Sequence, residues 1–183
     1  MLRLGSSSQT RAELLTKAGI EFVQMSVEFD EDAVVAHDAK NFVYLATLGK
    51  YHTNFKHFGI EDYPLLVADT VISTGGNILR KARCESEARN ILLTQSGNIT
   101  SIITCQIFHS KNVKLVDISS TDYLFEKFDE EDLESYLKSG DWRGKAGACM
   151  VEGFCKNYIK EVRGFESTAM GLTTEVIKPY LMF

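Results

Sequence analysis

One apolar run limits the possible folds of this chain more than any other stretch. Residues 65–73 read LLVADTVIS and form the most apolar, most β-branched run of the 183 residues. Such a run is typical of a buried strand. It carries one carboxylate, Asp69, and a buried carboxylate is costly unless it is paired, binds a metal or borders a cavity. The alternative is that Asp69 turns the chain between two short strands.

The length and charge of the chain exclude several classes of protein. A chain of 183 residues can bury a proper core, and we expect a single domain over residues 1–183. The formal net charge of −5 argues against a nucleic acid polymer as partner, since such binders need a basic field. The apolar runs are too short to span a membrane, and residues 1–5 show no signal core. We therefore expect a cytoplasmic protein.

The order of the predicted elements indicates an α/β fold with mixed strand directions. We expect a largely antiparallel sheet in two lobes, with flanking helices and a central cleft as the natural ligand site. Strands are predicted at residues 1–5, 21–27, 65–73, 78–81, 99–108, 112–128 and 157–162. Helices are predicted at 12–19, 38–58, 86–95 and 129–138, with a final helix ending at about 181. The four cysteines form no CxxC pair and are expected to be reduced.

A serine-rich turn lies between the first strand and the first helix. Residues 6–11 read SSSQTR, with Ser7 or Ser8 as the helix N-cap. Free backbone N–H groups and hydroxyls at the positive end of a helix suit a phosphate, and Arg11 would point its fork at the same place. The alternative is a plain capping turn with a surface arginine.

Other charged residues become informative only as a set. Residues 28–32 hold four carboxylates, which form either a solvated loop or a cation site. Lys50 lies in a predicted helix, where a lysine usually faces water. If Arg11, Lys50 and Lys81 converge with Glu31 and Asp69, one cleft holds three cations and two acids. That set suits a polyphosphate with a divalent metal.

The same residues, in the same order, resemble the motifs of the Maf family. Residues 4–15 (LGSSSQTRAELL) resemble its opening motif, LASxSPRRxELL. Further matches lie at residues 29–31 (FDE), 45–50 (LATLGK, for LAxxKA), 68–81 (for ADTxV…ILxKP), 145–153 (for KAGAYxxQG) and 163–172 (for IxGxxxNVxGLP). The match covers nearly the whole chain in the correct order.

This resemblance implies a cytoplasmic nucleoside triphosphate pyrophosphatase. Maf-like proteins release a nucleoside monophosphate and pyrophosphate, need a divalent metal cation such as Mg²⁺ or Mn²⁺, and are commonly homodimers. Their α/β architecture is shared with the inosine triphosphate pyrophosphatases. The family has also been linked to arrest of septum formation, so the alternative is a non-catalytic nucleotide-binding regulator of cell division that acts through protein partners.

The resemblance also assigns roles to residues. Asp69 matches the proton acceptor, and Glu31 with Asp69 would hold the metal. The phosphate and metal site would be lined by Ser6, Ser8, Arg11, Glu31, Lys50 and Lys81. The positions that bear on base choice match Thr10, Thr70 and Glu152.

Some positions depart from the family pattern. Thr10 stands where the first of two paired arginines is usual, and Glu152 stands in place of a glutamine. Members that prefer thymidine and uridine triphosphates usually carry both usual residues, whereas the subgroup associated with 7-methylguanosine triphosphate has a bulky residue and a glutamate. This chain has the glutamate but a small Thr10. We therefore expect a substrate other than thymidine triphosphate, in line with a role in clearing modified or non-canonical nucleotides.

Overall fold

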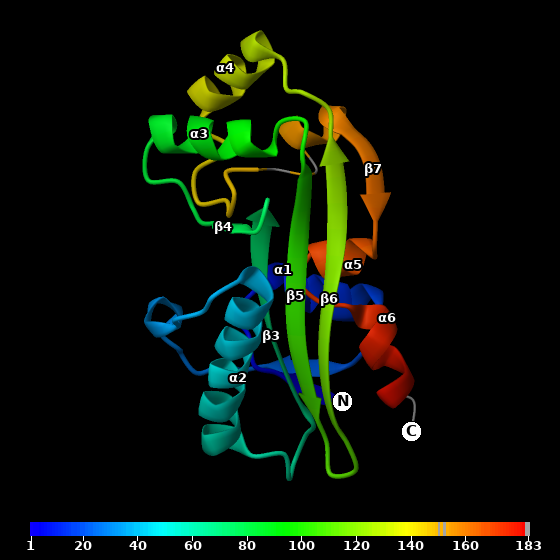
Figure 1. Cartoon of the computed structure of the whole chain (residues 1–183). Helices are drawn as coiled ribbons and strands as arrows, with labels where there is room; N and C mark the ends of the chain where they lie inside the picture. The colour runs from blue at the N-terminus through cyan, green and yellow to red at the C-terminus, as the bar shows by residue number, and fades with distance from the viewer. Residues whose placement is uncertain (150, 152, 182–183) are drawn as a thin grey trace. The chain divides into compact units, whose positions relative to one another are not determined.

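The computed structural model describes residues 1–149, 151 and 153–181 and divides into two compact units. Unit 1 consists of Met1–Thr70, Ile103–Ser120 and Phe165–Phe183, and unit 2 of Val71–Ile102 and Thr121–Gly164. Three long strands, β3 (Leu65–Thr74), β5 (Ile99–His109) and β6 (Lys114–Phe125), contribute residues to both units (Figure 1). No helix in the described part of the chain is both long enough and apolar enough to cross a membrane.

The strands form a mixed sheet, as the sequence predicts. Its order is β2-β1-β3-β5-β6-β7, with β4 paired to β3. The short strands are β1 (Leu2–Leu4), β2 (Phe22–Gln24), β4 (Asn77–Leu79) and β7 (Ile159–Arg163). Strand β1 is parallel to β2 and β3, whereas β3–β4 and β6–β7 are antiparallel. The predicted α/β class, with a largely antiparallel sheet and flanking helices, is confirmed. The central cleft stays a prediction.

In unit 1, helices cover both faces of the strands. Leu66 and Ala68 of β3 belong to a core that includes residues of α1 (Gln9–Lys17) and α6 (Thr174–Ile177). Leu65 and Val67 pack instead with Tyr51 of α2 (Ala39–Phe58). In Figure 1, α2 lies in front of β3 and α1 lies behind it. Because successive side chains of a strand point to opposite faces, β3 presents alternate residues to the two helix layers.

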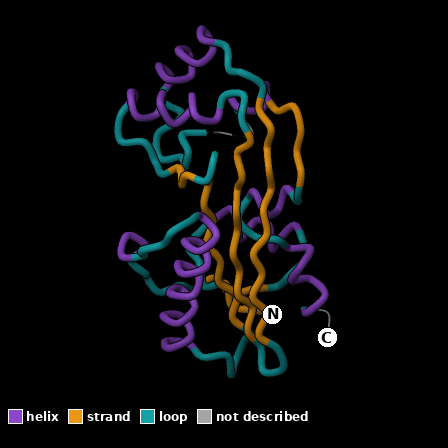
Figure 2. The backbone as a smooth tube through the Cα atoms, viewed as in Figure 1, coloured by secondary structure: helices purple, strands orange, loops and turns teal. Residues whose placement is uncertain are grey.

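Unit 2 contains two neighbouring helices, α3 (Glu85–Gln95) and α4 (Glu130–Ser139), which Figure 2 shows in purple. Arg89 of α3 forms ion pairs with Glu130 and Glu134 of α4. The Asp129 carboxylate caps α4 by accepting from two backbone N–H groups, and Gly140 ends the helix in the left-handed conformation. The helix predicted at residues 129–138 is therefore present, with acidic residues in its first turn.

Several predicted elements have other bounds in the structure; β2, for example, is Phe22–Gln24 rather than 21–27, and α1 is Gln9–Lys17 rather than 12–19. The return strand of the hairpin is Asn77–Leu79 rather than 78–81. The strand predicted at 157–162 begins later, because Phe154–Tyr158 forms a 3-10 helix before β7. The final helix is shorter, with α6 followed by a 3-10 turn at Lys178–Tyr180 that contains Pro179. Proline lacks the N–H that would continue an α-helix.

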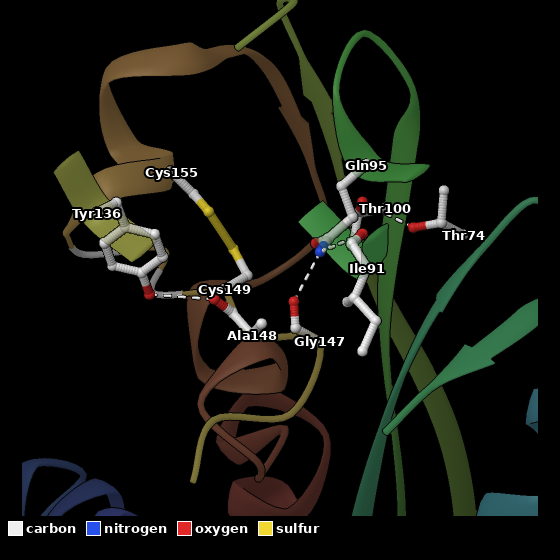
Figure 3. Close-up of a disulfide and its surroundings, with 9 residues drawn as sticks. All are labelled: Thr74, Ile91, Gln95, Thr100, Tyr136, Gly147, Ala148, Cys149 and Cys155. Carbon is white, nitrogen blue, oxygen red and sulfur yellow. Dashed lines mark hydrogen bonds between the residues drawn. A yellow bond between two sulfur atoms is a disulfide. The ribbon is translucent and has the colours of Figure 1, made fainter. Parts of the chain in front are cut away.

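The prediction that all four cysteines are reduced is wrong for one pair. Cys149 and Cys155 form a disulfide (Figure 3), while Cys84 and Cys105 are free thiols. The backbone before this disulfide is held on both sides. Gln95 Nε2 donates to the Gly147 carbonyl at 2.7 Å, and the Tyr136 hydroxyl donates to the Ala148 carbonyl at 3.1 Å. The segment that resembles the KAGA motif is therefore anchored to α3 and α4.

Candidate active site

The serine-rich turn caps helix α1, and its hydroxyl groups also accept hydrogen bonds from Arg11. The Ser8 hydroxyl is the N-cap of α1 and accepts from the Arg11 backbone N–H at 3.4 Å. The Ser6 hydroxyl is buried and accepts from the Ser8 backbone N–H at 3.2 Å. The two hydroxyls thus hold the turn at the positive end of α1, where an anion is favoured.

Arg11 does not lie free on the surface, so the plain capping alternative is wrong. Its Nε donates to the Gly171 carbonyl at 2.9 Å. Its Nη1 donates to the Ser6 hydroxyl at 3.1 Å, and its Nη2 donates to the Thr70 hydroxyl at 3.2 Å. Burial lowers the pKa of the Arg11 guanidinium, while the charges of Asp69 and Glu31 raise it. Arginine nevertheless stays protonated in proteins, so the site keeps a fixed cation.

Asp69 lies inside the unbroken strand β3, which rules out the turn alternative. Its side chain is buried, and the Asp69 Oδ1 accepts from Lys50 Nζ at 2.7 Å. The Asp69 Oδ2 is also buried and has no hydrogen-bond partner among the described residues. Burial raises the pKa of the Asp69 carboxyl above its usual value, and the Lys50 ammonium opposes that rise.

Lys50 is shared between two carboxylates rather than exposed on the wet face of α2. Its Nζ lies 2.5 Å from Glu31 Oε1 as well as 2.7 Å from Asp69 Oδ1. The Lys50 side chain is 16% exposed and that of Glu31 is 48% exposed. Glu31 therefore forms one charged cluster with Lys50 and Asp69, and its side chain is partly exposed to solvent.

The acidic segment that carries Glu31 is fixed against α2 by two contacts. Asn54 of α2 is buried, and its Oδ1 accepts from the Val27 backbone N–H at 3.1 Å. The Phe29 ring lies across Gly49, where an added Cβ would be 2.2 Å from the ring. The glycine one residue before Lys50 thus lets the aromatic ring, and with it the 3-10 turn Glu31–Ala33, approach the helix.

Asp69 and Thr70 are neighbours on β3, and their side chains contact different helices. Asp69 contacts Lys50 of α2, and Thr70 contacts Arg11 of α1. Strand β1 pairs with β3 at Leu65 and Leu66, so Asp69 and Thr70 lie beyond the end of β1. The charge of Asp69 raises the pKa of Arg11, and the charge of Arg11 lowers the pKa of Asp69.

Three predicted site residues are not placed in this set. Lys81 lies in unit 2, where it is exposed and its backbone bridges Ala146. Thr10 is exposed on the first turn of α1. Glu152 falls outside the described residues. Their roles stay predictions.

The carboxylates of the site fit a hard divalent cation. Mg²⁺ prefers oxygen ligands and is usually bound by one or two carboxylates together with water and substrate phosphates. Asp69 Oδ2 is a buried oxygen without a hydrogen-bond partner in the described part of the chain, and Glu31 contacts the same ammonium group. Among the described residues, no group of three or more His, Cys, Asp or Glu residues is arranged around a metal position.

Several residues that shape the site were not singled out from the sequence. They are polar or small residues that hold the charged groups: Gly49, Asn54, Thr104, Thr168 and Gly171. Gly49, Thr168 and Gly171 fall within the segments matched at residues 45–50 and 163–172, and these matches are the signal that could have pointed to them. Asn54 and Thr104 have no such signal, because the partners through which they act on the site are far away in the sequence.

Comparison with known proteins places the chain in a family. The model of the Maf-like proteins matches residues 1–182, and the chain belongs to this family. A protein of Nitratiruptor sp. is 55% identical over 177 residues, and the match covers 96% of this chain and 95% of that protein. A Helicobacter pylori protein is 38% identical (95% and 91% covered), and a Campylobacter jejuni protein is 34% identical (99% and 100%). All three relatives are named nucleoside triphosphate pyrophosphatases.

Proposed function

We propose that this protein is an enzyme that hydrolyses nucleoside triphosphates to a nucleoside monophosphate and pyrophosphate. The observation that carries the proposal is the buried carboxylate of Asp69, which has one oxygen on Lys50 and the other without a partner among the described residues. Membership of the Maf family and the names of the three relatives support the same reaction.

Asp69 is the proposed proton acceptor. Its carboxylate would take the proton of the water that attacks the α-phosphorus, and its raised pKa brings it closer to the range in which a general base works well. Lys50, Lys81 and Arg11 would stabilise the charge that develops on the pyrophosphate leaving group. The hydroxyls of Ser6 and Ser8 would lie at the phosphates.

The proposed cofactor is Mg²⁺ or Mn²⁺. Glu31 and Asp69 would hold the cation, which supplies positive charge to the phosphate oxygens when bound. Lys50 lies between these two carboxylates, so it would keep both in place.

The finer parts of the proposal concern the base and the assembly. Thr10, Thr70 and Glu152 are the proposed determinants of base choice, and modified or non-canonical nucleotides are the proposed substrates. Of these three residues, Thr70 is the one whose hydroxyl bonds to Arg11, so a base-selecting role would be linked to the phosphate site. We also propose a cytoplasmic homodimer without nucleic acid or membrane partners.

The test is the release of pyrophosphate from a panel of canonical and modified nucleoside triphosphates, with Mg²⁺ or Mn²⁺. The proposal expects release from at least one nucleotide, together with the matching monophosphate. Release of orthophosphate instead would contradict cleavage between the α- and β-phosphates. Nucleotide binding without any release would favour the regulatory alternative.

A further inference from the structure

A chain of hydrogen-bonded hydroxyl groups runs from Arg11 into β5 and the C-terminal segment. The Thr70 hydroxyl, which accepts from Arg11, lies 2.9 Å from the hydroxyl of Thr104. Thr104 is fully buried, and its hydroxyl donates to the Thr168 carbonyl at 2.7 Å. All four residues belong to unit 1.

The direction of these hydrogen bonds is fixed by proton count. A hydroxyl has one proton to donate, and a carbonyl only accepts. The Thr104 hydroxyl donates its one proton to the Thr168 carbonyl, so it must be the acceptor in its contact with Thr70. Thr70 therefore donates to Thr104 and turns its lone pairs toward Arg11. The guanidinium thus faces an oriented acceptor rather than a freely rotating hydroxyl.

The C-terminal segment closes the other side of Arg11. The Thr168 carbonyl that accepts from Thr104 also accepts from the Gly171 backbone N–H at 3.0 Å, and the Gly171 carbonyl accepts from Arg11 Nε. A Cβ added at Gly171 would lie 3.2 Å from Arg11 Nε and 3.3 Å from the Thr70 hydroxyl, and the glycine has a φ of 106°. The Thr168 carbonyl therefore links two of the three groups that accept from the guanidinium, Thr70 and Gly171, and the third acceptor is the Ser6 hydroxyl.

We propose that Thr104 is a positioning residue for the reaction, which holds the Arg11 guanidinium at the phosphate site through Thr70. The inference rests on the proposed function. A guanidinium recognises phosphate oxygens with a planar fork, so its orientation matters as much as its charge. Fixing that orientation before the reaction lowers the cost of reaching the transition state.

A matched pair of valine variants tests this role. Thr104→Val keeps the side-chain shape and removes the hydroxyl. The control is Thr100→Val, because Thr100 lies on the same strand and its hydroxyl makes an equivalent buried contact with Thr74, also at 2.9 Å (Figure 3). Thr104→Ser restores the hydroxyl. If Thr104→Val does not fold, Thr104→Cys is used instead. Cysteine is similar in size to threonine, and its thiol is a weaker hydrogen-bond donor than the hydroxyl.

The expected result is a split between kcat and KM. Thr104→Val should lower kcat about tenfold with KM within about twofold, since Arg11 keeps its charge and loses its orientation. The kcat of Thr104→Ser should stay within about threefold of the wild-type value. The kcat of Thr100→Val should equal the wild-type value. Equal kcat values for Thr104→Val and Thr100→Val in an active protein would overturn the positioning role and leave the proposed function standing.

A binding measurement separates failure of the inference from failure of the function. If the wild type releases no pyrophosphate from any nucleotide, the proposed hydrolysis is wrong, and affinity for inorganic pyrophosphate is measured by calorimetry instead. A loss of about fivefold in Thr104→Val, and no loss in Thr100→Val, supports the positioning of Arg11 at a phosphate site. Equal affinities in the two variants, or no binding by the wild type, overturn it.

Discussion

Lys50 lets two carboxylates occupy one small region of the protein. Asp69 is buried, and a charged carboxylate without a partner would be strongly destabilising there. The ammonium group at 2.7 Å compensates this charge, and it lowers the pKa that burial raises. The second carboxylate, Glu31, shares the same ammonium and raises the pKa of Asp69. Lys50 and Glu31 therefore shift the pKa of Asp69, the proposed base, in opposite directions.

A second titratable group of unit 1 predicts how stability depends on pH. His109 Nδ1 lies 2.7 Å from the Tyr51 hydroxyl, and Lys114 lies over the Tyr51 ring at 3.9 Å. Burial, and then the Lys114 charge, lower the pKa of His109. The Phe55 ring also packs against it.

A lowered pKa in the folded state means that the fold favours neutral His109. Its contribution to stability is thus fully present above the usual histidine pKa and is lost as the pH falls through the folded value. His109→Gln should therefore lose less free energy of unfolding than the wild type between about pH 7.5 and about pH 5. Urea unfolding at both pH values measures this, and an equal loss in the two proteins would show that His109 contributes nothing.

At the scale of elements, the segment that carries Phe29 and Glu31 can approach α2 closely because residue 49 is a glycine and has no side chain. The Phe29 ring occupies the space that a Cβ at position 49 would need. In an ordinary exposed helix, Gly→Ala stabilises by about 1 kcal/mol. Here we expect Gly49→Ala to destabilise by about 1–3 kcal/mol, as overpacking does, and to lower activity by displacing Glu31 from Lys50.

The Phe29→Ala background provides the control for this prediction. Without the ring, Gly49→Ala should become neutral or stabilising, because the helix propensity of alanine is then unopposed. Chemical unfolding of the two single variants and the double variant measures the coupling. Additive effects of the two substitutions would mean that the ring and the glycine do not constrain each other.

The disulfide of unit 2 gives a second prediction at this scale. Cys149 and Cys155 are six residues apart, and closing so short a loop stabilises by about 2 kcal/mol in the chain-entropy model. Cys155→Ser should lower the free energy of unfolding by about that amount. A strong reductant should remove the difference between the variant and the wild type. Four reactive thiols in the unreduced, denatured wild type would contradict the pairing.

Across the whole molecule, the sequence pattern predicts elements better than it predicts their partners. β3, α2 and α4 follow from local signals: a β-branched run, an amphipathic repeat and an N-cap with acids in the first turn. The final helix predicted from the sequence is longer than α6, because apolar residues alone do not show where a helix stops. The disulfide was missed because spacing along the chain does not give the distance between two sulfur atoms.

The same difference between local and distant signals applies to the site. Charged residues such as Asp69 and Lys50 stand out where apolar neighbours surround them, so they can be found from the sequence. Thr104 and Gly171 act through contacts with residues 34 to 160 positions away. Such pairs depend on strand register and on the packing of the C-terminal segment, which no local pattern encodes.

Unit 1 brings its site together from the N-terminal turn, α2, β3 and the segment before α6. The central claim is that this assembly serves one carboxylate, Asp69. Asp69→Asn keeps the size of the side chain and removes its capacity to accept a proton. Asp117→Asn is the matched control, because Asp117 is an aspartate on β6 of the same unit that is bonded to Gln106 and Ser119.

The most direct measurement is the rate of pyrophosphate release by these two variants, with circular dichroism melts to verify folding. We expect Asp69→Asn to lose about 10²–10⁴-fold in turnover while it stays folded, as is typical when a general base is removed. Asp117→Asn should keep near wild-type turnover. A folded Asp69→Asn protein with full activity would contradict the assignment of Asp69 as the base.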